Sequence, residues 1–182
     1  MVLLDAINLI LRKLEEHAVT SVNSTYSTVS FIKPKIEQNK ERLLMEGFWF
    51  NKYRMTLPAD ILGEVVTPAD TLAFYPDSTD YTWDGQYITT EEGSRTINES
   101  VPGWVILDRD FDTLPSAAQY AITFAACAEI YADEAGVDDV YTSIKEDETE
   151  ARVELGTQQV KQLQRTARQR RSFNKWRLAL RS

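Results

Sequence analysis

The chain has 182 residues, of which 43% are hydrophobic and 10% aromatic, so it can fold as one domain and is not a disordered protein. It has one cysteine and one histidine, Cys127 and His17, which excludes an intrachain disulfide and leaves a weak set of residues for metal binding or nucleophilic catalysis. The formal net charge of −8 is unevenly distributed: residues 1–150 carry 11 Lys+Arg against 27 Asp+Glu, whereas residues 151–182 carry 9 against 1. An acidic body with a basic tail can attract a second copy of itself.

The N-terminal residues 1–11 are apolar, but they do not resemble a signal peptide. Asp5 interrupts the run, and the basic pair Arg12 and Lys13 follows it. No stretch approaches the roughly 20 apolar residues of a transmembrane helix. The sequence therefore predicts a soluble protein, made in the cytoplasm and without a membrane partner.

Two helices are expected first along the chain. Apolar residues recur at helical spacing over residues 3–17 and again over about residues 29–46, where Pro34 lies inside the run. Because proline is tolerated in the first turn, the second helix either begins at Pro34 or kinks there. Gly47 is a natural end for this helix.

A β insertion is expected over about residues 48–108. From Phe48 the apolar pattern changes to two-residue alternation, which predicts a strand, and residues 72–75 and 104–107 predict two more. Asp84-Gly85 between two short apolar runs is a strong hairpin signal. The aromatic run 48–50 is predicted to anchor this small antiparallel unit to the helices.

Helical patterning returns over residues 114–135, with Asp112 or Thr113 as the expected N-cap and Pro115 in the first turn. This helix is apolar on most faces, as is typical of the central helix of a bundle. The last helix, over about residues 138–170, keeps a loose apolar stripe, so we expect a solvated or interface helix.

The predicted fold class is α+β: a bundle of about four helices with a small antiparallel β insertion between the second and third helices. Residues 1–164 are predicted to form a single domain. Helical periodicity predicts that the bundle core contains Leu3, Ile7, Ile10, Leu14, Ile36, Leu43, Ile122, Ala125, Ala126 and Ile130.

Residues 165–182 are predicted to form a basic docking tail, because no acid follows Glu154 and apolar residues remain near the end of the chain. Arginine and aromatic residues are the usual anchors of protein interfaces. The predicted partner-binding residues are Arg165, Arg168, Arg170, Arg171, Phe173, Trp176 and Arg177. An arginine-rich nucleic-acid-binding segment is the alternative interpretation, although the acidic body would repel phosphate.

The sequence carries no recognisable motif for catalysis or for a cofactor. It has neither a phosphate-binding loop nor a dinucleotide fingerprint. Asp108, Asp110 and Asp112 alternate as in a calcium loop, but the glycine and the later glutamate of that pattern are missing. Cys127 lies in an alanine-rich run and is predicted to be a buried structural thiol. We therefore expect no catalytic, cofactor-binding or metal-binding residues and no enzyme, although 28 acids leave a hydrolytic carboxylate pair open.

Five short segments carry a family resemblance: residues 6–22, the run Gly-Phe-Trp-Phe-Asn at 47–51, Leu-Pro-Ala-Asp at 57–60, the turn at 84–87, and Asp-Phe-Asp-Thr-Leu-Pro at 110–115. In order and spacing they resemble the tail tubular protein A family, the head-to-tail adaptors of short-tailed bacteriophages (podoviruses). The chain departs from that family at Glu15, where glycine is usual, and at Ala18, where proline is usual. The resemblance spans about residues 6–136.

The resemblance implies a structural protein of the virion. Such adaptors form a closed ring of about twelve copies, located between the portal protein and the tail nozzle (tail tubular protein B-like), with tail fibres attached at the side. Genomic DNA passes through the central channel without sequence-specific binding during packaging and ejection. An acidic channel wall would suit this role, because like charge keeps DNA from adhering.

Overall fold

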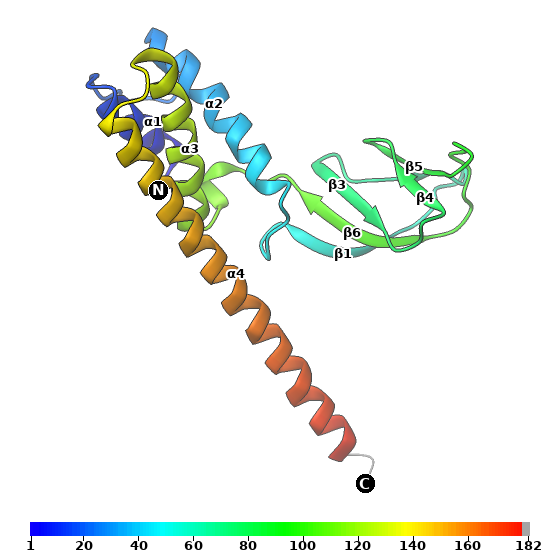
Figure 1. Ribbon diagram of the computed structural model, residues 1–182. Coiled ribbons are helices and arrows are strands. Elements are labelled where there is room, and N and C mark those ends of the chain that lie inside the picture. The colour runs from blue at the N-terminus through cyan, green and yellow to red at the C-terminus, as the bar shows by residue number, and fades with distance from the viewer. Residues whose placement is uncertain (180–182) are drawn as a thin grey trace.

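The computed structural model describes the backbone of residues 1–179 and the side chains of residues 1–165. Figure 1 shows a helical bundle, a β unit that projects from one side of it, and one long helix that continues beyond it. The described elements are α1 (Leu3–Lys13), α2 (Ser27–Leu44), β1 (Lys52–Leu57), β2 (Val65–Val66), β3 (Thr71–Pro76), β4 (Tyr81–Trp83), β5 (Tyr87–Thr90), β6 (Val101–Leu107), the 3-10 helix η1 (Phe111–Thr113), α3 (Ser116–Glu134) and α4 (Asp139–Ala179). The predicted α+β class, with the β insertion between α2 and α3, is confirmed.

The first two helices have different ends from those predicted. α1 ends at Lys13 instead of residue 17, because the chain turns at Glu15, which has a φ of 60°. α2 begins at Ser27 and continues through Pro34, so the proline does not start the helix.

The expected cap of the third helix is wrong. The residue before α3 is Pro115, and no side chain caps the helix. Asp112 instead accepts a hydrogen bond of 2.7 Å from the backbone N–H of Leu3, which joins η1 to the start of α1. This contact directs the Asp112 carboxylate toward α1 and not toward the first turn of α3.

α3 is the central helix of the bundle and packs against α1, α2 and α4. Its many alanines allow the neighbouring helices to approach closely, and its buried residues cover most of its circumference. The predicted core residues are buried, with two exceptions: Leu3 and Leu14 are half-buried at the edge of the helical core.

The expectation of a solvated last helix is wrong for the first half of α4. Ile144, Ala151 and Leu155 are buried against the rest of the bundle. After Leu155, none of the side chains described up to residue 165 is buried. α4 continues to Ala179, past the predicted end at residue 170, and leaves the bundle as it does so (Figure 1).

The β unit contains two three-stranded antiparallel sheets within the described chain, in the orders β1-β6-β3 and β2-β5-β4. The predicted hairpin at Asp84-Gly85 is confirmed by the pairing of β4 with β5. Gly103 on β6 allows a close approach, because a Cβ there would lie 2.5 Å from the ring of Phe74. A second, smaller core fills the unit: Leu57, Val65, Phe74, Ile88, Val101 and Val105.

The junction between the bundle and the β unit is a turn over residues 48–51, and the strand begins only at Lys52. The rings of Phe48, Trp49 and Phe50 are half-buried and pack against the helical core, as predicted for an anchor. The Phe48 and Phe50 rings stack with centroids 5.6 Å apart, and Trp49 meets Phe50 edge to face at 5.0 Å. The aromatic run therefore fixes where the β unit begins.

Candidate functional site

The predicted docking residues all lie on α4. Arg165 is exposed there. The other six predicted partner-binding residues lie beyond the described side chains, so their contacts stay predictions: Arg168, Arg170, Arg171, Phe173, Trp176 and Arg177. Residues 156–179 form a helical extension roughly 36 Å long at 1.5 Å per residue. The extension places this basic stretch far from the core of its own subunit.

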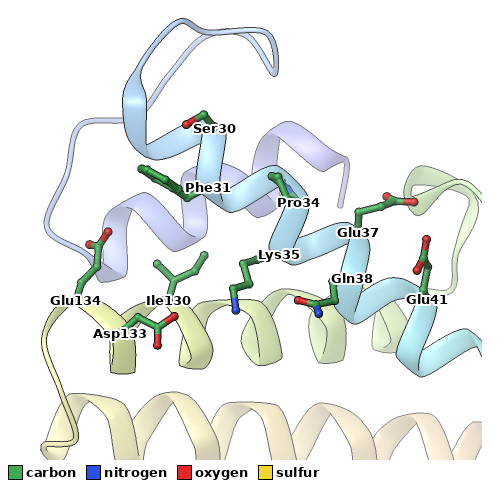
Figure 2. Close-up of a pocket in the computed structure, with 10 residues that line it drawn as sticks. All are labelled: Ser30, Phe31, Pro34, Lys35, Glu37, Gln38, Glu41, Ile130, Asp133 and Glu134. Atoms are coloured by element: carbon green, nitrogen blue, oxygen red, sulfur yellow. The ribbon is translucent and has the colours of Figure 1, made fainter.

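A groove of about 710 Å³ lies between α2 and α3, as Figure 2 shows. Phe31, Pro34 and Ile130 supply its apolar wall, and Phe31 is 61% exposed. Lys35 also reaches the groove, but its ammonium pairs with Glu129 at 3.0 Å. The rest of the groove is polar or acidic: Ser30, Glu37, Gln38, Glu41, Asp133 and Glu134. Such a lining suits an apolar segment that carries basic side chains.

A second hollow, of about 340 Å³, lies between α3 and α4. Tyr120 and Phe124 stack in it with their ring centroids 6.1 Å apart, and Tyr120 is 42% exposed. Ser116, Ala117 and Ala151 complete the wall on the two helices. The α4 side carries the polar and acidic residues Asp147, Glu150, Glu154 and Gln158. We call this hollow the α3–α4 pocket.

A network of ion pairs links α2, α3 and α4. Glu129 on α3 accepts hydrogen bonds from Lys35 at 3.0 Å and Arg42 at 2.7 Å, both on α2. Burial by itself raises the pKa of Glu129, but the hydrogen bond from Lys35 and the charges of Lys35 and Arg42 outweigh it, so the pKa is lowered. Arg152 on α4 pairs with Glu46 at 3.1 Å. These carboxylates are occupied in holding helices together.

The three alternating aspartates, Asp108, Asp110 and Asp112, do not share a common site. Asp108 pairs with the buried Lys40, which also pairs with Glu37. Burial lowers the pKa of Lys40, but the hydrogen bonds to Glu37 and Asp108 outweigh it, so the pKa is raised. Asp110 precedes η1, and Asp112 binds the start of α1. In the described part of the chain, no group of three His, Cys, Asp or Glu is placed to hold a metal ion.

Cys127 is fully buried on α3, as predicted. Burial raises the pKa of its thiol to about 11, so the thiol is protonated at neutral pH. The side chain acts as a small apolar group in the helical core.

The α2–α3 groove and the α3–α4 pocket were not foreseen from the sequence. Each forms where two helices pack, so neither has a motif of its own. The sequence held one weak indication of these surfaces. Phe31 and Tyr120 carry large rings that lie beside the apolar stripes of their helices.

The described chain has an apolar groove with an acidic lining, an aromatic pocket and a helix that extends beyond its own core. Such surfaces are typical of the class of proteins that assemble with other macromolecules. No helix among the described residues is both long and apolar enough to cross a membrane.

The comparison with known families names the class. The family model for tail tubular proteins matches residues 4–165, and the chain therefore belongs to this family, as a structural protein of the bacteriophage tail. It is 29% identical over 143 residues to the tail tubular protein A of Klebsiella phage KP34, and the alignment covers 77% of each chain.

Proposed function

We propose that the protein is a ring-forming adaptor that joins the portal protein to the tail nozzle and lines part of the DNA ejection channel. Its partners are further copies of itself, the portal, the nozzle and the tail fibres. It acts by docking and makes or breaks no covalent bond, so it is not an enzyme.

The observation that carries this proposal is the course of α4. Its last core residue is Leu155, yet the helix continues to Ala179 outside the bundle. A solvated helix of this length with no packing partner gains little stability, because most helical stability comes from tertiary contacts. A partner that covers the extension would supply the missing contacts.

Charge supports an acidic surface as the partner of this extension. Residues 151–182 carry 9 Lys+Arg and 1 acid, whereas residues 1–150 carry an excess of 16 acids. We propose that the stretch from Arg165 to Arg177 binds an acidic surface of the portal or of a neighbouring subunit through its arginines, with Phe173 and Trp176 as apolar anchors.

The acidic body suits the passage of DNA. Like charge on a channel wall raises the energy of phosphate close to it, so DNA moves past without adhering. The body therefore lines the channel, and the basic extension contacts protein.

One experiment tests the adaptor against the nucleic-acid-binding alternative. Purified protein is mixed with its portal and imaged by negative stain, and its particle mass is measured alone and with duplex DNA. The proposal expects a closed ring seated on the portal and no complex with DNA. A monomer or dimer that binds DNA and ignores the portal would support the alternative and refute the adaptor.

A further inference from the structure

The free side of α4 carries an apolar ridge. Val153, Val160 and Leu163 are 65%, 52% and 57% exposed. Their spacings of seven and three residues put them along one face of the helix. Val153 and the buried Leu155 are two residues apart, or about 160° around the helix axis at 3.6 residues per turn. The ridge therefore faces away from the bundle core.

Gly156 lies on the same face, between Val153 and Val160. Glycine inside an exposed helix lowers helix stability relative to alanine. A Cβ at Gly156 would meet no atom within 4 Å, so the packing of its own subunit does not require a glycine there. A gap in an apolar ridge is useful when a large side chain of another molecule approaches the helix backbone.

The α3–α4 pocket lies at the same height on α4 but faces the other way. Ala151 in its wall and Val160 on the ridge are nine residues apart, or about 180° around the helix. The pocket offers the exposed ring of Tyr120, a side chain of the size that the gap at Gly156 would admit.

The charges around the pocket favour contact with the ridge over contact with the acidic surfaces of a second copy. Asp147, Glu150 and Glu154 border the pocket and would repel most surfaces of this acidic body. The ridge is bordered by Arg152, Thr157 and Gln164, whereas the two acids of residues 149–164, Glu150 and Glu154, lie on the pocket side of the helix.

We propose that the ridge Val153–Leu163 of one copy packs into the α3–α4 pocket of the next copy, with Tyr120 seated over Gly156. The two surfaces differ and face apart, so the contact is head-to-tail. Such a contact forms a ring when the rotation between neighbouring copies closes on itself. This interface rests on the proposed function, because it is the contact by which the adaptor ring would form.

Two full-length variants test the interface: Val160→Asp on the ridge and Tyr120→Asp in the pocket. Val160 is 52% exposed, so Val160→Asp should melt close to wild type. Tyr120→Asp loses the stack on Phe124 and should melt lower, so its folding is checked by far-UV circular dichroism before association is measured. By sedimentation velocity, wild-type protein should associate and each variant alone should remain a monomer. An equal mixture should form dimers and nothing larger, because one variant keeps an intact pocket and the other an intact ridge.

Two further substitutions sharpen the test. Val137→Asp, at a residue 76% exposed on the α3–α4 connection, should assemble like wild type. Gly156→Ala should raise the melting temperature, because alanine favours helix. It should also weaken self-association by at least about fivefold, because the added methyl group overpacks the contact.

The outcomes separate the interface from the adaptor role. Rings that form equally well with either aspartate variant would overturn the interface and leave the adaptor role standing. Tyr120→Asp protein that still dimerises by itself would mean that ridges meet ridges, which also overturns it. Wild-type protein that stays monomeric both alone and with its portal would refute the interface and the proposed function together.

Discussion

At the scale of single residues, the charged side chains between the helices form ion pairs that stabilise the fold. Glu129 receives hydrogen bonds from two cations of α2, and the same helix holds Lys40 between Glu37 and Asp108. The network makes the contact between α2 and α3 sensitive to pH.

Replacing Glu129 by glutamine tests that sensitivity. The pKa of Glu129 is lowered from 4.5 in the folded protein, so its ionised form adds stability above about pH 4.5 and loses it as pH falls through the lowered value. At pH 7 we expect Glu129→Gln to reduce the free energy of unfolding by about 1 kcal/mol, since the three groups are partly exposed.

The measurement is urea unfolding of both proteins from pH 7 to pH 3. The difference should vanish at the acid end, where Glu129 is protonated in the wild type. Glu134→Gln, an exposed acid on the same helix, is the control. A difference in the free energy of unfolding that stays constant from pH 7 to pH 3 would contradict the role given to ionised Glu129.

At the scale of elements, Asn51 joins the bundle to the β unit. Its side chain is fully buried and donates to the carbonyls of Leu44 at 2.9 Å and Leu107 at 3.2 Å. Its side-chain oxygen accepts from the N–H of Phe48 at 2.9 Å. One residue therefore ties the end of α2, the aromatic turn and the end of β6 together.

Asn51→Ala should lower the free energy of unfolding by about 3 kcal/mol, because it leaves buried backbone groups without partners. Urea unfolding followed by tryptophan fluorescence gives the value, and Asn23→Ala, at an exposed loop residue, should change it by less than about 0.5 kcal/mol. A variant as stable as wild type would show that the junction relies on its aromatic rings alone.

At the scale of the whole molecule, folding and assembly use different parts of α4. Burial on the helix ends at Leu155, and Gln159 still accepts a hydrogen bond of 2.9 Å from the N–H of Trp49. The predicted docking residues, from Arg165 to Arg177, come after that contact. The chain can therefore lose its end without losing its core.

Truncation after Gln164 should leave the melting temperature nearly unchanged and preserve self-association, because the ridge remains. It should abolish joining to the portal in a pull-down assay. With the full chain, joining should weaken as salt rises, because charges about 10 Å apart are screened at 0.1 M. Truncated protein that joins the portal as well as the full chain would rule out the docking role of the tail.

Several features of this protein could be predicted from the sequence because they depend on neighbours along the chain. The apolar period identified the helices, and Asp84-Gly85 identified a hairpin because few residues adopt that turn. The order and spacing of short motifs were also enough to predict the family to which the chain belongs. The ends of helices were less predictable, since Asp112 serves α1 and not α3.

The sequence by itself determined the α+β class, the β insertion, the central place of α3 and the charge asymmetry, because periodicity and composition are local or additive properties. Only the tertiary structure decided that the first half of α4 joins the core, that Asn51 links the two units, and that a groove and a pocket open between helices. Those features depend on which side chains meet across the fold, and sequence separation does not reveal such contacts. The residues of the ridge and of the pocket are of common types, and nothing in the sequence marks them as surfaces. Only the packing of the helices places the two sets on opposite sides of α4.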